Sequence, residues 1–259
     1  MNPLRLAFGL LTAVPVGRLP SVDRRSAGAA MLLAPLTTLP LLALVAAAHG
    51  AVRVGAPPLL AAALLVTAGA LLSRAMHLDG LADTADGLSA GFDAETSLRA
   101  MKASDTGPSG VAAVALALLL QVASLDALLG SASGASLAAL AWLGSRHSLA
   151  WACRRGVPTA QPTGLGALVA GTVGRTGLAV AAALLGLVAV GLSALAQPES
   201  SDPALWQGLA VVVAGLLAAE SVLRRCRRRL GGVTGDVLGA GIEVSLTVSL
   251  AIGALLATA

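Results

Sequence analysis

The sequence predicts an all-α protein in which about seven helices, within a range of six to eight, cross a membrane as one bundle. The first observation is composition: 56% of the 259 residues are hydrophobic and only 12% are charged, whereas a soluble domain has about 25% charged residues. The second is length, because about 20 consecutive apolar residues span a bilayer core as a helix. These apolar runs are continuous and do not alternate with polar residues, which favours helices over a closed barrel.

Seven segments are long and apolar enough to span, and we treat the whole chain, 1–259, as a single integral-membrane domain. Two shorter apolar segments, 4–16 and 165–173, are expected to lie in the interface or to re-enter, although an eighth span could fall within 157–176. The seven expected spans are Ala27–His49, Pro57–Arg74, Ser109–Leu129, Ala135–Ala152, Gly177–Gln197, Leu205–Leu223 and Val237–Ala257.

The distribution of lysine and arginine predicts the orientation, because positive residues favour the cytoplasmic side. With a cytoplasmic N-terminus, only Arg53 lies clearly outside, whereas the arginine run within 224–229 lies inside. We therefore expect a protein integral to the bacterial cytoplasmic (inner) membrane, in contact with its lipid. The arginine run is either a topology signal beside anionic lipid or a phosphate-binding patch. Nucleic acid is not an expected partner, since no aromatic residues are interleaved with the arginines.

The segment HLDGLADTADGL, residues 77–88, is the strongest candidate for a functional site. It lies in the expected cytoplasmic acidic segment 75–108, and Asp79, Asp83 and Asp86 follow at intervals of four and three residues. This spacing puts the three carboxylates on one face of a helix. Their mutual repulsion predicts a hard divalent cation, and magnesium suits carboxylates that leave room for water and a substrate phosphate. The alternative is that the aspartates cap helices in a polar turn.

Glycines and a second polar stretch accompany the acidic residues. Gly80 and Gly87 follow Asp79 and Asp86 directly, and a glycine lets a phosphate or a neighbouring backbone approach closely. The stretch MKASDTGPSG, residues 101–110, contains the only lysine of the chain. Lys102 could neutralise a phosphate oxygen, with Ser104 and Asp105 beside it, or it could mark a helix end at the interface.

Charged residues within the expected spans extend the candidate site. Arg146 lies inside the span 135–152, and a charge inside a span indicates function. Asp236 begins the last span and Glu243 follows seven residues later, on the same helix face and expected to face the bundle interior. Carboxylates for a metal, cations for phosphate and glycines together predict a magnesium-dependent enzyme that acts on a phosphoanhydride at the inner membrane surface.

Three blocks of the sequence resemble those of the cobalamin synthases, the adenosylcobinamide-GDP ribazoletransferases. The first is HLDGLADTADG at 77–87, the second has the form M-K-x-S-x-x-G-x-x-G at 101–110, and the third has the form G-G-x-T-G-D-x-L-G-A-x-x-E at 231–243. The blocks are in family order and the resemblance covers essentially the whole chain. The chain departs from many members at Ala103, where an Asp is usual, and Asp105 is a candidate to compensate.

The resemblance implies transfer of the phosphocobinamide group of adenosylcobinamide-GDP to α-ribazole or α-ribazole 5′-phosphate, with release of GMP. For this reaction, our hypothesis is that Asp79, Asp83 and Asp86 hold magnesium against the diphosphate. Lys102 and Arg146 would then offset charge on the phosphoryl oxygens, and Asp236 would complete the metal site or act as the base. Glu243 is the least defined of the set. Other nucleotide-loop enzymes or a second copy of the chain are candidate partners.

Two other classes compete with this interpretation. A CDP-alcohol phosphotransferase has a motif that begins D-x-x-D-G-x-x-A-R, which Asp83, Asp86, Gly87 and Ala90 fit but Gly91 does not. A cation-coupled transporter has carboxylates within its spans. Its sites tend to lie near the midplane between repeats, whereas the acids here gather at one membrane face and no inverted repeat is visible.

Overall fold

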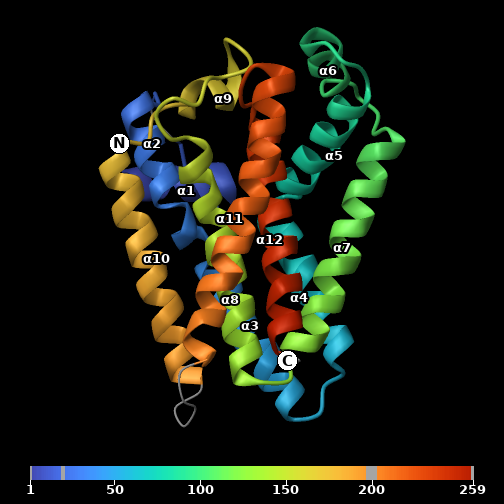
Figure 1. Ribbon diagram of the computed structural model, residues 1–259, viewed down its shortest axis with the longest axis vertical. Coiled ribbons are helices and arrows are strands. Elements are labelled where there is room, and N and C mark those ends of the chain that lie inside the picture. Colours follow the sequence, from blue (N-terminus) through green and yellow to red (C-terminus); the bar gives the residue numbers. More distant parts are fainter. Residues whose placement is uncertain (1, 19–20, 197–202, 258–259) are drawn as a thin grey trace.

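The computed structural model describes residues 2–18, 21–196 and 203–257, and the elements in these ranges are helical (Figure 1). Five long helices form most of the bundle: α7 (Pro108–Leu128), α8 (Ala132–Ala152), α10 (Arg175–Ala196), α11 (Pro203–Leu230) and α12 (Gly235–Ala257). The shorter elements are α1 (Pro3–Leu11), α2 (Arg24–Leu32), the 3₁₀ helix η1 (Ala34–Thr38), α3 (Leu39–Arg53), α4 (Pro58–Leu72), α5 (Met76–Ser89), α6 (Ala94–Ala100) and α9 (Gly164–Val169).

The chain is a polytopic membrane helix bundle, as predicted. Among the described residues, five helices are long and apolar enough to span, and the bent pair α4 and α5 brings the number to six if it counts as one span. The five are Ala34–Arg53, Pro108–Leu128, Arg175–Ala196, Trp206–Leu230 and Gly235–Ala257. The predicted span ends agree with α7, α10 and α12 to within two residues where they can be compared, but Gln197 lies outside the described residues.

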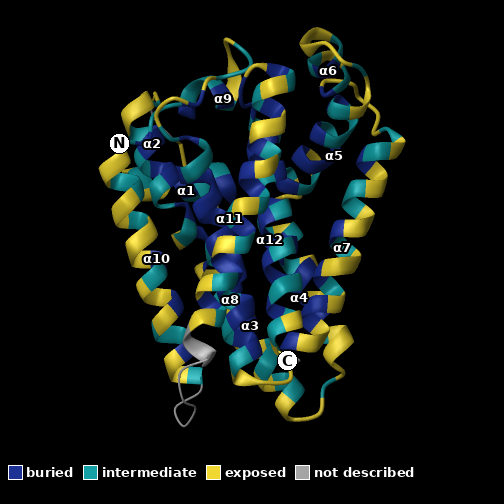
Figure 2. Ribbon diagram, viewed as in Figure 1, coloured by how far each residue is buried: buried dark blue, intermediate teal, exposed yellow. Residues whose placement is uncertain are grey.

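Helix α8 covers the predicted span 135–152 but is not among these apolar helices. Its serines, Arg146 and His147 make it less apolar, and most of its residues are buried among the other helices. It packs against α12, α11, α10 and α3. Figure 2 shows the buried residues of α8 at the centre of the bundle. A polar helix is tolerated here because protein rather than lipid surrounds it.

The first predicted span, Ala27–His49, is wrong as a single helix. The structure divides it into α2, η1 and α3. Pro35 and Pro40 explain the division, because proline lacks the amide hydrogen that a continuing helix needs. The segment 157–176 contains the six-residue α9 and the first two residues of α10, so no eighth spanning helix lies within it.

The break between α4 and α5 positions the acidic segment. The two helices meet at an angle of 86°, and Arg74 and Ala75 between them have left-handed backbone angles, with φ of 55° and 57°. Non-glycine residues adopt this conformation at a cost of about 1–3 kcal/mol each, so the surrounding packing must hold it. Beyond the break, α5 packs against α12 and α7. The acidic segment is therefore built into one end of the bundle.

Helix α12 is the central element, in contact with α11, α8, α5 and α7. Its sides are rich in small residues, and a Cβ added to Gly239 would lie 3.3 Å from the backbone of His77 in α5. Close approach of this kind replaces the hydrophobic effect as the source of helix association in lipid. The crossing of α5 and α12 thus brings the first and third sequence blocks together.

Candidate functional site

Four carboxylates gather where α5 crosses the start of α12. Asp79, Asp83 and Asp86 lie on the single helix α5, as their spacing predicted. The carboxylates of Asp79, Asp86 and Asp236 are close enough to that of Asp83 to act on it electrostatically. Asp79 is exposed, whereas Asp83 and Asp236 are half-buried. In the part of the chain that the structure describes, neither Asp79 nor Asp83 forms a side-chain hydrogen bond or ion pair, which leaves their oxygens free for a ligand.

Thr234 orients Asp236 at the N-terminus of α12. The Thr234 hydroxyl donates to Oδ2 of Asp236 at 3.2 Å and accepts from the backbone amide of Val237 at 3.2 Å. The threonine therefore caps the helix and fixes one oxygen of the aspartate. Oδ1 of Asp236 remains available to the cavity beside it. Thr234 was not among the site residues expected from the sequence, although a threonine directly before a helix is a recognisable cap signal.

Asp86 has partners within the protein that the sequence analysis did not foresee. The backbone amide of Gly107 donates to its Oδ2 at 2.7 Å, and that of Gly110 donates to its Oδ1 at 2.8 Å. These amides begin α7, so the carboxylate satisfies donors that have no partner inside the helix. Asp86 therefore caps a helix, which was the alternative to metal binding. The helix that it caps is α7, whereas Asp86 itself lies on α5.

The described residues contain no group of three His, Cys, Asp or Glu side chains that converges as a preformed metal cage. The chemistry of the acidic cluster nevertheless fits magnesium, which prefers oxygen ligands and is commonly held by one or two carboxylates together with water and substrate phosphates. Asp79 and Asp83, with Asp236 beside them, are the free carboxylates that could serve. Asp86 is less available as a third ligand than Asp79 or Asp83, because both of its oxygens already accept hydrogen bonds from backbone amides.

The glycines of the first block serve helix packing rather than a phosphate-facing surface. Gly80 is buried, and a Cβ there would lie 2.7 Å from the backbone oxygen of Asp236. Gly87 is buried against Met101 and the backbone oxygen of Ser97. The sequence left open whether these glycines admit a phosphate or a neighbouring backbone. In the structure both admit parts of the protein: the α12 backbone at Gly80, and a side chain and a backbone oxygen at Gly87.

The polar side chains of the second block lie on an exposed loop between α6 and α7. Lys102, Ser104 and Asp105 are exposed, and within the described residues their side chains have no hydrogen bond or ion pair. They do not converge with the acidic cluster in the way that Gly107 and Gly110 of the same block do. Their predicted contact with a phosphate remains a prediction.

A buried polar network lies below the acidic cluster. Gln121 of α7 donates to Oε2 of Glu243 at 2.9 Å and to the hydroxyl of Thr247 at 3.0 Å. Nδ1 of His77 lies 4.0 Å from Oε1 of Glu243, and the Arg146 guanidinium acts on this carboxylate electrostatically. Arg146 also lies over the Trp142 ring, 5.8 Å from its centroid.

Glu243 therefore faces the bundle interior, as predicted. Arg146 is only 3% exposed, and its position among α8, α12 and α5 argues against direct contact with a substrate phosphate. Gln121 was not among the residues expected from the sequence, although an amide side chain within an apolar span is itself a signal of an interhelical hydrogen bond.

A cavity of about 240 Å³ opens beside the acidic cluster. His77, Asp79 and Asp236 form its polar part, and both ring nitrogens of His77 are buried without a hydrogen-bond partner. The rest of the lining is largely apolar and includes Leu10, Leu11, Met31, Leu149, Leu165 and Ile242.

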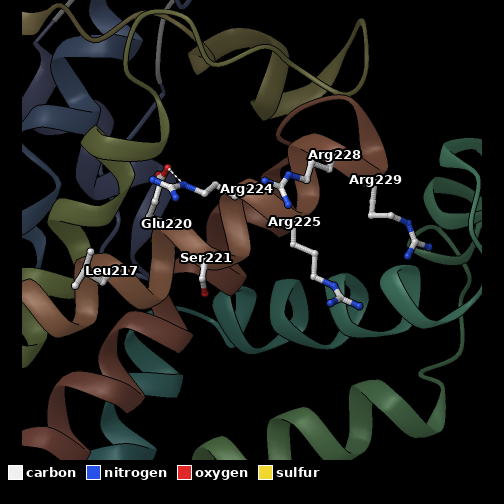
Figure 3. Close-up of a pocket in the computed structure, with 7 residues that line it drawn as sticks. All are labelled: Leu217, Glu220, Ser221, Arg224, Arg225, Arg228 and Arg229. Carbon is white, nitrogen blue, oxygen red and sulfur yellow. Dashed lines mark hydrogen bonds and ion pairs between the residues drawn. The ribbon is translucent and has the colours of Figure 1, made fainter.

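The arginine run continues α11 as a helix to Leu230, beyond the predicted span end at Leu223. Figure 3 shows Arg224, Arg225, Arg228 and Arg229, which line an open hollow together with Glu220. Arg224 and Arg154 pair with Glu220 at 2.8 and 3.0 Å. Arg229 donates to the backbone oxygen of Gly91 and stacks on Phe92, which ties α11 to the loop after α5.

Comparison with known proteins identifies the family. Residues 3–254 match the model of the cobalamin-5-phosphate synthase family. A Nocardioides protein named adenosylcobinamide-GDP ribazoletransferase is 44% identical over 95% of both chains. Proteins of the same name from Frankia casuarinae and Stutzerimonas stutzeri are 39% and 36% identical, over 98% and 94% of this chain and 95% and 94% of their own. No solved structure matches. With nearly its whole length matched, the chain belongs to the cobalamin-5-phosphate synthase family.

Proposed function

We propose that this chain is an adenosylcobinamide-GDP ribazoletransferase and catalyses the final step of cobalamin assembly. The observation that carries the proposal is the meeting of Asp79, Asp83 and Asp236 at the crossing of α5 and α12, because it joins the first and third family blocks in one site. The full-length family match supports the same activity. The chain is thus an enzyme whose donor is adenosylcobinamide-GDP and whose acceptor is α-ribazole or its 5′-phosphate.

The reaction needs an acid-rich site that binds a diphosphate. The oxygen of a ribose hydroxyl forms a bond to the phosphorus nearest cobinamide, and the bond from that phosphorus to the oxygen of GMP breaks. GMP leaves with the electron pair of that bond, and the hydroxyl proton passes to a base. Asp236 is the candidate base, because Thr234 holds its Oδ2 and leaves Oδ1 free to accept the proton.

Magnesium is the proposed cofactor, and Asp79 and Asp83 are its proposed ligands, with Asp236 near enough to contribute. When bound, the ion would neutralise charge on the diphosphate oxygens. Asp86 then acts mainly by holding the start of α7, through Gly107 and Gly110.

The proposed roles of the two cations differ. Lys102 is exposed on its loop, and its proposed role is to neutralise a phosphate oxygen of the substrate as a point charge. Arg146 is buried, and we assign it a positioning role through Glu243.

We also propose that the site faces the cytoplasm from the bacterial cytoplasmic membrane. The arginine end of α11 lies at the same end of the bundle as α5, α6 and α9, whereas the connection from α3 to α4 lies at the opposite end (Figure 1). Arg53 is at that opposite end. This sorting of positive charge supports a cytoplasmic acidic site. Association with other nucleotide-loop enzymes or with a second copy remains part of the proposal.

The test is GMP release by the purified protein in detergent. GMP should appear only when adenosylcobinamide-GDP, α-ribazole and magnesium are all present. CDP-diacylglycerol should neither be consumed nor compete, in contrast to a CDP-alcohol phosphotransferase. Turnover in detergent, without a second compartment, also excludes transport as the sole activity. Absence of GMP from a folded sample would overturn the proposed function.

A further inference from the structure

The cavity beside the acidic cluster has a composition that restricts its ligand. It lies where α1, α2, α5, α8, α9 and α12 meet, and most of its wall consists of leucine, isoleucine and methionine side chains. The wall also carries the Asp79 and Asp236 carboxylates, and His77 is the remaining polar side chain that lines it. Such a site suits a ligand with a flat apolar portion and a hydroxylated portion directed at the acids.

His77 provides a second, independent observation. The residue is only 4% exposed, and neither ring nitrogen has a hydrogen-bond partner. Oε1 of Glu243 lies 4.0 Å from its Nδ1, which is longer than a hydrogen bond, and the Arg146 guanidinium acts on the ring electrostatically. A buried polar group without a partner is costly, so a ligand that supplies one gains affinity.

We propose that this cavity binds the aromatic base of the acceptor nucleoside, and that an N–H of His77 donates a hydrogen bond to the unsubstituted ring nitrogen of the base. The inference rests on the proposed function and adds the acceptor subsite to it. The base of α-ribazole is a dimethylbenzimidazole, which is flat, carries two methyl groups and has one ring nitrogen with a free lone pair. It therefore needs apolar walls and a single donor, which this cavity supplies.

The other parts of the two substrates fit less well. A guanine base has several donors and acceptors along its edge, and the apolar wall would leave most of them without partners. A corrin ring is far larger than a cavity of about 240 Å³. The ribose of the acceptor, attached to the bound base, would lie on the side of Asp79 and Asp236. This arrangement presents a ribose hydroxyl to the proposed base Asp236.

The first test narrows the cavity from its rim. Leu10 lines the cavity and is only partly buried, so Leu10→Trp should fill space without displacing the core. We expect the KM for α-ribazole to rise about tenfold or more, while the KM for adenosylcobinamide-GDP stays unchanged. Leu4→Trp is the matched control, because Leu4 lies on the same helix α1 but is 37% exposed and does not line the cavity.

The second test is a double-substitution cycle, in which His77 is replaced in the protein and the ring nitrogen is replaced in the ligand. Binding of α-ribazole, and of an analogue in which that nitrogen is replaced by a C–H group, is measured calorimetrically without the donor substrate. The wild-type protein should bind α-ribazole about tenfold more tightly than the analogue, the effect of one hydrogen bond. His77→Phe should bind the two ligands equally.

The outcomes separate this inference from the proposed function. A wild-type enzyme that releases GMP, together with an unchanged acceptor KM in Leu10→Trp, would place the base elsewhere and overturn the inference alone. The same holds if the wild-type protein does not distinguish the two nucleosides, or if a folded His77→Phe variant still does. Should His77→Phe fail to fold, the Leu10→Trp result and the wild-type preference decide the question. Absence of GMP release by the wild-type enzyme would instead reject the proposed function.

Discussion

The backbone amide of Gly107 donates a hydrogen bond of 2.7 Å to Oδ2 of Asp86, and thereby joins the second sequence block to the first. Gly110 completes the contact at Oδ1. A side chain at Gly107 would collide with this carboxylate, since a Cβ there would lie 2.6 Å from Oδ1. The two glycines are thus explained by one aspartate that lies 21 residues before the first of them.

Replacing this aspartate should therefore affect stability. Asp86→Asn removes the charge from two amide contacts and leaves one amide facing an NH₂ group, so we expect the free energy of unfolding to fall by about 2 kcal/mol. Thermal unfolding in detergent measures the change. Asp83→Asn is the control on the same helix, and it should leave stability unchanged or raise it, because it removes a charge that Asp79, Asp86 and Asp236 repel. Equal losses in both variants would contradict the capping role.

The activity of the same control variant tests the metal assignment. Asp83→Asn should lower GMP release by about 10²-fold or more, because an amide oxygen neutralises a cation far less than a carboxylate does. The magnesium concentration needed for half-maximal rate should also rise. Full activity at ordinary magnesium in a folded Asp83→Asn protein would reject Asp83 as a ligand.

The crossing of α5 and α12 should tolerate no side chain at Gly80. Gly80→Ala places a methyl group against the Asp236 backbone and should destabilise the protein by about 1–3 kcal/mol and lower activity. Gly241→Ala, on α12 with open space around its Cβ position, receives the same helix-propensity gain without the collision. Unfolding curves of the two variants should move in opposite directions, and parallel shifts would refute the tight crossing.

The buried network should show coupling between Glu243 and Arg146. Glu243→Gln keeps an acceptor for Gln121 but leaves the Arg146 guanidinium without its balancing charge, which should cost about 3 kcal/mol. Adding Arg146→Gln should recover much of that loss. The exposed Glu95, which pairs with Arg99 at 3.3 Å, provides the control, and Glu95→Gln should change little. Simple additivity of the two interior substitutions would disprove the coupling.

Orientation can be tested with cysteine labelling. Cys153 and Cys226 are both buried and free, so background labelling in sealed vesicles should be low. Arg228→Cys and Arg53→Cys place exposed thiols at opposite ends of the bundle. A reagent that does not cross membranes should label Arg53→Cys in intact cells and Arg228→Cys only in inverted vesicles. The reverse pattern would invert the proposed topology.

Several features of the fold and the site could be predicted from local sequence. Apolar length was enough to find α7, α10 and α12 to within two residues where the ends are described. Helical spacing was enough to place Asp79, Asp83 and Asp86 on one helix. The cost of an unpaired carboxylate in lipid was enough to turn Glu243 inward.

Other features depend on contacts between distant parts of the chain. The break before α5 coincides with the predicted span end at Arg74, but Arg74 and Ala75 are neither glycine nor proline, so no local signal marks their left-handed backbone. The partners of Asp86 follow from tertiary packing and not from the spacing of the acidic residues. The cavity combines Leu10 of α1 with His77 of α5, which only the folded bundle brings together.

The length of α11 determines where the enzyme meets its water-soluble substrates. At 1.5 Å per residue its 28 residues extend about 42 Å, whereas the hydrocarbon layer is about 30 Å thick. The arginine-bearing turns therefore project beyond the hydrocarbon, at the same end of the bundle as α5 and α6. A diphosphate that approaches this end meets protein charges while still hydrated. The transfer reaction can then occur in a membrane protein without any charged reactant entering the hydrocarbon layer.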